Sequence, residues 1–223
     1  PASYAQCRIW LNEETNRKNV TSEMTINNKL FLYEINKNVK ISLKRLNEVL
    51  ELIIEKHEIL RTSIKFDKET NELKQYINES NKKSFELLKS IYETNDEIER
   101  IINEEKYSNK LFNLNEGLVF RCHIIYYREI GENELIKPKD LIIFNFHKIS
   151  FDNLSIEIFL NDLNEFYYES TTKDHWKNNI KNILRYIDYS IIEKQISMNE
   201  ASKYWLNYFE NSNLNKILSF PYD

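Results

Sequence analysis

Glycine and proline are scarce in this chain. Its 223 residues include only two glycines, Gly117 and Gly131, and three prolines. A phosphate-binding loop needs several glycines in a short segment, because its backbone must approach the phosphate groups closely. The sequence therefore excludes the P-loop and the G-x-G-x-x-G fingerprint, and with them the common motifs for nucleotide binding. We expect the chain to bind no cofactor directly.

Cysteine is equally scarce, and long apolar runs are missing. Cys7 and Cys122 lie far apart, each among apolar residues, so they indicate neither a disulfide framework nor a metal site. Two buried, reduced thiols are expected, which is typical of a cytoplasmic protein. No apolar run approaches the roughly 18 residues that a membrane helix needs. No membrane association is expected.

Acidic and basic residues are nearly balanced and well mixed. Thirty-five acidic and 31 basic residues give a net charge of -4, and the mean hydropathy is -0.61. No basic face stands out, so nucleic acid is not expected as a partner. Hydrophobic residues make up 41% of the chain, which is enough for a globular core.

Hydrophobic spacing predicts alternating helices and strands. Helices are expected over 3–14, 42–58, 97–107, 154–168, 179–195 and 199–210. Strands are expected over 28–36, 62–67, 72–78, 82–88, 118–128 and 141–147. The segment 130–140 is predicted to be a turn region. The pattern favours an α/β two-layer sandwich with a mixed sheet and its helices on one face.

Histidine offers four candidates for chemistry. His123 lies within a predicted strand and is expected to be a satisfied core residue, whereas His175 lies in a polar loop without a pattern. His57 ends a helix and is expected to cap it. His147 ends a strand that is apolar throughout, and Asp152 follows five residues later, just before a helix. Such loops commonly carry the active site in α/β folds.

The segment around His147 resembles a family motif. Phe146 to Asn153, FHKISFDN, is similar to the H-H-x-x-x-D-G pattern of condensation domains of nonribosomal peptide synthetases and their acyltransferase relatives. Six other segments resemble further motifs of these domains, in the same order: SYAQCRIW (3–10), KHEILRT (56–62), LFNLNEGL (111–118), YIDYS (186–190), YWL (204–206) and LSFPYD (218–223).

The resemblance implies a fold and a set of partners. Condensation domains are similar to chloramphenicol acetyltransferase, with two lobes in a V and the active site between them. Residues 1–223 are expected to be the N-terminal lobe, and the C-terminal lobe is absent from this chain. The first residues show no signal peptide and no initiator methionine, which predicts a chain cut from a longer one. The expected partners are the C-terminal lobe and the carrier (thiolation) and adenylation domains of an assembly line.

The same resemblance implies the chemistry of the site. A condensation domain joins two substrates held as thioesters on the phosphopantetheine arms of carrier domains, and an amide forms. The second His of the motif takes a proton from the amine or hydrogen-bonds the intermediate. Here His147 is the first His, and Lys148 occupies the position of the second. An ordinary Lys, with a pKa near about 10.4, is protonated at neutral pH and cannot accept a proton.

The remaining motif positions imply structural roles. The motif Asp, here Asp152, is expected to shape the loop by an ion pair with Arg61. Asn153 replaces the motif Gly and tolerates left-handed backbone angles better than most residues. His147 is expected to point away from Lys148 and to form hydrogen bonds inside the lobe, because successive side chains of a strand face opposite sides.

Three functions stay open at the level of sequence. The first is a condensation domain with an altered site, and the second is a non-catalytic copy that docks carrier domains. The third is a free-standing acyltransferase of the same superfamily. Lys148 favours the second over the first, whereas the SYAQCRIW and YWL segments favour a condensation domain over the third. Without its second lobe, the chain alone is expected to be inactive.

Overall fold

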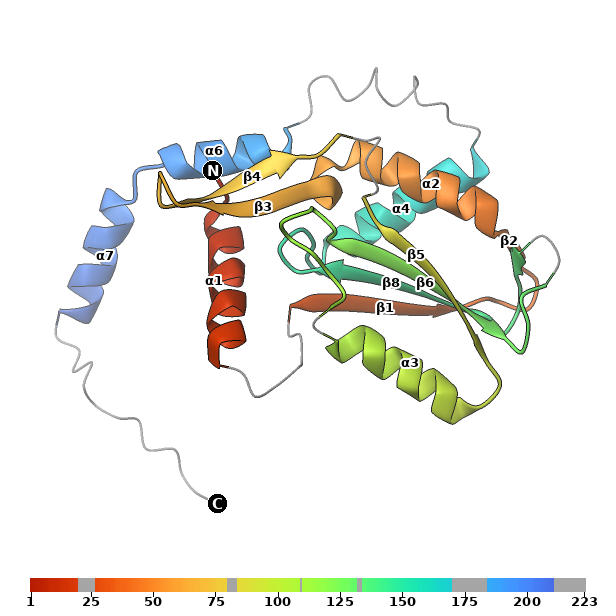
Figure 1. Ribbon diagram of the computed structural model, residues 1–223. Helices are drawn as coiled ribbons and strands as arrows, with labels where there is room; N and C mark the ends of the chain where they lie inside the picture. Colours follow the sequence, from red (N-terminus) through yellow and green to blue (C-terminus); the bar gives the residue numbers. More distant parts are fainter. Residues whose placement is uncertain (20–26, 80–83, 109, 132–133, 170–183, 211–223) are drawn as a thin grey trace.

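A computed structural model describes residues 1–19, 27–79, 84–108, 110–131, 134–169 and 184–210. The elements in these ranges (Figure 1) are α1 (Tyr4–Asn19), β1 (Asn28–Glu34), β2 (Ile41–Ser42), α2 (Leu43–Lys56), the 3-10 helix η1 (Glu58–Arg61), β3 (Thr62–Asp67), β4 (Glu72–Ile77), β5 (Glu86–Tyr92), α3 (Asn95–Tyr107), β6 (Phe120–Tyr127), β7 (Leu135–Ile136), β8 (Leu141–His147), α4 (Ser155–Tyr168), α6 (Tyr186–Gln195) and α7 (Asn199–Phe209).

The centre of the lobe is a four-stranded mixed sheet in the order β1-β8-β6-β5. β8 is antiparallel to both of its neighbours, and β5 is parallel to β6. Every residue of β8 is buried, because helices and strands surround it on all sides. The predicted mixed sheet and the doubly buried strand over 141–147 are confirmed.

Helices cover both faces of this sheet. Phe144 and Phe146 of β8 belong to the core shared with α2 and α4, whereas Ile143 packs with Ile101 of α3 on the other face. Figure 1 shows α3 on the side of the sheet opposite to α2 and α4. The α/β sandwich is confirmed, but the prediction that its helices share one face misses α3. A strand that is apolar on both faces needs cover on both.

The boundaries of the elements follow local chemistry. The Ser42 side chain accepts a hydrogen bond from the Arg45 backbone (3.3 Å) and caps α2, as predicted. Thr94 and Glu97 form a capping box, so α3 begins earlier than predicted. Other boundaries also differ: α1 continues to Asn19, β5 lies at 86–92 rather than 82–88, and the predicted turn region contains β7, which pairs with β2.

A smaller unit beside the sheet consists of α1, α6 and the β3–β4 hairpin (Figure 1). The backbone of Ala2 donates to Leu73 of β4 (2.8 Å), and the Gln6 side chain donates to Gln75 (3.1 Å). Ile149, just after β8, packs in the apolar cluster of this unit. The loop that follows β8 is therefore held between the sheet and the smaller unit.

The core residues expected in β6 are buried. His123 is hydrogen-bonded to Glu105 (2.9 Å) and Ser90 (2.8 Å), so it is the satisfied core histidine that the sequence predicts. Cys122 is buried with a free thiol, whereas Cys7, expected to be buried, is only half-buried at the edge of the apolar cluster of the smaller unit. His175 lies outside the described residues.

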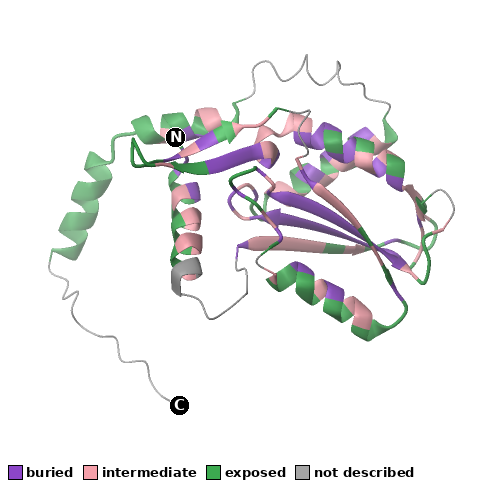
Figure 2. Ribbon diagram, in the orientation of Figure 1, coloured by how far each residue is buried: buried purple, intermediate pink, exposed green. Residues whose placement is uncertain are grey.

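The last two helices expose apolar side chains. Figure 2 shows α7 exposed along its whole length. Four of its apolar side chains are more than half exposed: Tyr204, Trp205, Leu206 and Tyr208. Exposed apolar side chains are thus gathered on α7. The segment 218–223 lies outside the described residues. Within the described ranges, no helix is long and apolar enough to span a membrane.

Candidate functional site

His147 is locked inside the lobe. Its side chain is 1% exposed and packs edge-on against Phe112. The backbone N–H of Ile149 donates to its Nδ1 (3.1 Å). Nδ1 is therefore unprotonated in this geometry, and Nε2–H donates to Glu13 of α1 (3.0 Å). The prediction that His147 forms hydrogen bonds inside the lobe is confirmed.

Lys148 follows directly after β8, and the alternation of side chains along a strand predicts that it points away from His147. Its backbone N–H donates to the carbonyl oxygen of Asn27 (2.7 Å) and extends the pairing of β1 and β8. The side chain is half-buried. Burial and the neighbouring charge of Lys29 lower the pKa of the Lys148 ammonium.

Asp152 shapes the loop, but not through Arg61. Its carboxylate accepts hydrogen bonds from the backbone N–H groups of Leu154 (3.1 Å) and Ser155 (2.9 Å) and from the Ser155 hydroxyl (2.6 Å). These bonds cap the first turn of α4. The hydrogen bonds from Ser155 hold the pKa of the Asp152 carboxyl below its usual value.

The predicted ion pair between Arg61 and Asp152 is wrong. The Arg61 guanidinium donates to the carbonyl oxygen of Asn78 and lies 3.5 Å from Glu58. The family segment KHEILRT therefore ties η1 to the end of β4, rather than to the loop after β8. Asp152 is exposed, and its carboxylate accepts hydrogen bonds from the first turn of α4 instead.

Asn153 needs no left-handed backbone. It is exposed, and it is absent from the residues with positive φ in the described ranges. The change from the motif Gly to Asn therefore introduces no strain at this position. The expectation that Asn153 is accepted because Asn tolerates left-handed backbone angles therefore does not apply here.

His57 joins two helices rather than only ending one. Its Nε2 lies 2.5 Å from the carboxylate of Asp162 on α4, and the Lys56 ammonium lies 2.6 Å from the same carboxylate. Asp162 is buried, which alone would raise its pKa, but the hydrogen bonds from His57 and Lys56 lower the pKa overall. This cluster fixes α4, and with it the loop that α4 follows, against α2. Beside it lies a small apolar hollow of about 110 Å³, lined by His57, Phe151 and Ile158 among others.

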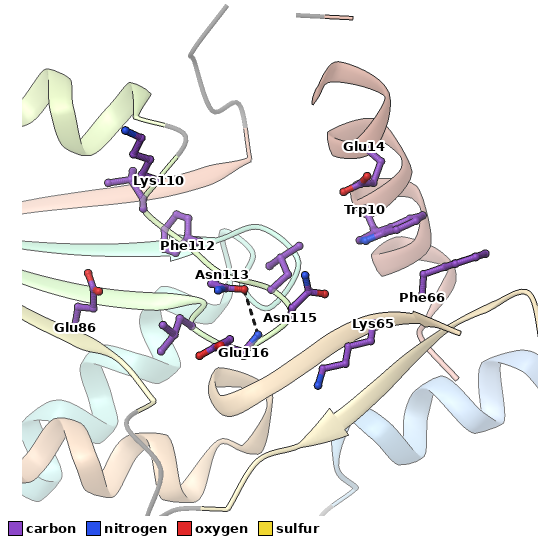
Figure 3. Close-up of a pocket in the computed structure, with 13 residues that line it drawn as sticks. Trp10, Glu14, Lys65, Phe66, Glu86, Lys110, Phe112, Asn113, Asn115 and Glu116 are labelled. Atoms are coloured by element: carbon purple, nitrogen blue, oxygen red, sulfur yellow. Dashed lines mark hydrogen bonds between the residues drawn. The ribbon is translucent and has the colours of Figure 1, made fainter. Parts of the chain in front are cut away.

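A larger hollow of about 980 Å³ is lined in part by Phe112 (Figure 3). Trp10 of α1 stacks on Phe66 of β3 with ring centres 5.5 Å apart, and both line it. Figure 3 shows the loop that carries Asn113 and Glu116 facing this pair across the hollow. The hollow is lined by neither His147 nor Lys148, so it is separate from the loop after β8.

The structure brings together some predicted site residues and separates others. His147, Lys148 and Asp152 lie on one loop, whereas Arg61 belongs to the β3–β4 unit. Sequence patterns do not single out Glu13, Lys29 or Asp162, because each acts on a residue that is distant in the chain. The arrangement presents a partly desolvated ammonium, Lys148, on a loop fixed on both sides. Such a group stabilises negative charge.

A comparison with known families finds one match along nearly the whole chain. The model of the family described as "Condensation domain" matches residues 1–222. A match of this extent includes the loop after β8 and every described element.

Several solved structures share this fold. The chain is similar to the X-domain from teicoplanin biosynthesis (18% identity, TM-score 0.71), covering 100% of this chain and 45% of that one. It is similar to the starter condensation domain of rhizomide synthetase in complex with C8-CoA (16%, 0.67, 94% and 45%). It is also similar to the epimerization domain from the third module of tyrocidine synthetase B (13%, 0.67, 99% and 46%). The chain thus spans less than half the length of these structures.

Proposed function

Because this chain belongs to the condensation domain family, we propose that it is the N-terminal lobe of a domain that joins a carrier-tethered thioester donor to an amine acceptor. The observation that carries the proposal is the loop after β8. By its resemblance to the family motif, this loop would carry the site, and Lys148, which is half-buried, would stand in the place of the catalytic His. The degenerate sequence HKISFDN (147–153) would make this an unusual member.

The reaction sets the task of Lys148. The acceptor amine attacks the thioester carbonyl, and the carbonyl oxygen becomes an oxyanion. The C–S bond then breaks, and the proton that the amine loses goes to the thiolate that leaves on the donor arm, which becomes a thiol. In this proposal Lys148 stabilises the oxyanion by its charge, since a protonated ammonium cannot accept the proton of the amine. Positioning of the two tethered substrates supplies much of the remaining rate.

The proposal requires partners that supply the rest of the site. The exposed apolar side chains of α7 favour a C-terminal lobe that covers them, because a contiguous apolar patch commonly marks an interface. Carrier domains would bring the phosphopantetheine arms, and an adenylation domain would load the carriers. Two free cysteines are in keeping with a cytoplasmic location.

A second candidate is a non-catalytic lobe that docks carrier domains without turnover. The observation in its favour is Lys148, which replaces a base by a group that is cationic unless its pKa falls far. The rest of the loop is intact, with His147 bonded to Glu13 and Asp152 capping α4. In this candidate the surfaces that bind carrier domains persist in a lobe that cannot transfer a proton.

Amide formation in a two-lobed protein distinguishes the two candidates. The natural protein, Lys148→His and Lys148→Ala are assayed with loaded donor and acceptor carriers, with Lys44→Ala on the exposed side of α2 as the matched control. If Lys148 stabilises the oxyanion, Lys148→Ala loses most of the rate and Lys44→Ala does not. A natural protein as slow as Lys148→Ala, with a gain of about 10²–10⁴-fold in Lys148→His, supports the docking lobe instead. Inactivity of all four rules out the condensing function.

A further inference from the structure

Two cationic side chains lie against the ring of Tyr127, the last residue of β6. The guanidinium of Arg128 lies 5.0 Å from the centre of this ring, and the ammonium of Lys139 lies 4.9 Å from it. Arg128 and Lys139 are both exposed, whereas Tyr127 is half-buried. Because β6 and β8 are antiparallel, the end of β6 lies at the opposite end of the sheet from His147. This cluster is therefore separate from the loop after β8.

The backbone that carries the two cations is fixed by buried groups. The carboxylate of Asp140, which is 0% exposed, accepts a hydrogen bond from the backbone N–H of Tyr127 (2.8 Å). The Tyr92 hydroxyl donates to the carbonyl oxygen of Lys139 (2.6 Å). The backbone N–H of Arg128 donates to the carbonyl oxygen of Tyr92 (2.8 Å). Both cations thus project from a preorganised backbone, which lowers the ordering cost of binding a ligand.

Both cations also occupy left-handed backbone positions. The angle φ is +67° at Arg128 and +80° at Lys139, a conformation that is costly for residues with long side chains. Lys139 is the third residue of a hydrogen-bonded turn, 137–140, where Gly or Asn is common when φ is positive. Strained residues of this kind are concentrated at functional sites. Two of them beside one ring point to a role for their side chains.

Neither cation has a carboxylate partner among the described residues. The two exposed carboxylates described in the same hairpin are already engaged. Glu129 lies 3.6 Å from the ammonium of Lys137, and Glu134 pairs with Lys89. The charges beside Tyr127 can therefore be neutralised by an anion that comes from outside this lobe.

We propose that Arg128 and Lys139, held against Tyr127, form a docking site for an acidic segment of a partner protein. An exposed ion pair contributes little by itself, so a single carboxylate or a free phosphate ion is held only weakly here. A segment with several carboxylates engages both cations, and its second contact then forms within the complex at a high effective concentration. The inference does not depend on the proposed function, because the site lies at the other end of the sheet.

NMR titrations at low ionic strength test the site, because salt screens exposed charges. They follow the backbone amides of residues 127–129, 139 and 140. The probes are an acetylated hexaglutamate peptide, the neutral hexaglutamine peptide and inorganic phosphate. Arg128→Gln and Lys139→Gln each remove one cation of the site, whereas Lys139→Arg keeps it. Lys44→Gln is the matched control, since it removes one exposed cation on α2.

Hexaglutamate should shift these amides, and hexaglutamine should not. Arg128→Gln and Lys139→Gln should each weaken the binding of hexaglutamate about fivefold, which corresponds to the loss of one exposed ion pair at low salt. Lys44→Gln and Lys139→Arg should keep the affinity. Absence of any shift with hexaglutamate, equal shifts with hexaglutamine, or an equal loss in Lys44→Gln overturns the inference. Phosphate that binds at the same amides as tightly as hexaglutamate assigns the site to a free anion and also overturns it.

Discussion

The hydrogen bond between Glu13 and His147 is the contact that fixes the loop from the side of α1, and it can be removed by one substitution. In Glu13→Ala, the Nε2–H of His147 loses its charged acceptor. His147 is 1% exposed, so water does not readily replace that acceptor. A hydrogen bond to a charged group contributes about 1.5–3 kcal/mol. We expect the free energy of unfolding to fall by about 2–3 kcal/mol in Glu13→Ala. The loss should be smaller in Glu13→Gln, which keeps an acceptor oxygen.

Urea denaturation measures the loss, and ring ¹⁵N spectra of His147 measure its cause. The natural chain should show the proton on Nε2 and a bare Nδ1, because Nδ1 accepts from Ile149. Glu157→Ala, which removes an exposed carboxylate from α4, is the control and should change stability by less than about 0.5 kcal/mol. The reasoning is refuted if Glu13→Ala is as stable as Glu157→Ala, or if Nδ1 of His147 carries the proton.

Three further substitutions test other parts of the site by denaturation. Asp162→Ala leaves the charges of Lys56 and His57 without their shared carboxylate and should cost about 3 kcal/mol; a loss below about 1 kcal/mol contradicts the cluster. Gly117→Ala should cost at least about 1 kcal/mol, because φ is +73° and a Cβ would lie 2.5 Å from the side chain of Asn78; an unchanged stability contradicts this. Asp152→Ala should cost about 1 kcal/mol at neutral pH. The folded pKa of Asp152 is lowered, so its contribution is present above the unfolded value of about 3.9 and is lost as the pH falls through the folded value. The difference from the natural chain should therefore vanish in acid, and a difference that persists there contradicts the capping role.

Local patterns predicted the elements of the main sheet well. The continuous apolar run of 141–147 predicted a doubly buried strand, and Ser42 marked the start of α2, because each is set by its own sequence neighbourhood. The position of α3 was not predictable from its own residues. Its apolar side chains fit either face of a sheet, and only the tertiary packing selects one.

The site was predictable in its sequence position but not in its contacts. The loop 147–153 was identified because its spacing resembles a family motif. The partners of Arg61 and Asp152 were wrong, since both residues had a nearer alternative: a backbone carbonyl at Asn78 and the first turn of α4. A charged residue satisfied by backbone groups close in the chain leaves no trace in sequence spacing. Glu13 escaped notice for the opposite reason, because its partner is 134 positions away.

His147 and Lys148, at the end of β8, contribute to the fold in different ways. His147 faces the interior, where Glu13 and the backbone of Ile149 occupy both ring nitrogens. It therefore cannot take the place of a base at position 148 without breaking two hydrogen bonds. Lys148 contributes to the fold through its backbone bond to Asn27, which any residue except proline can form. The side chain at position 148 can thus change while this backbone bond stays in place.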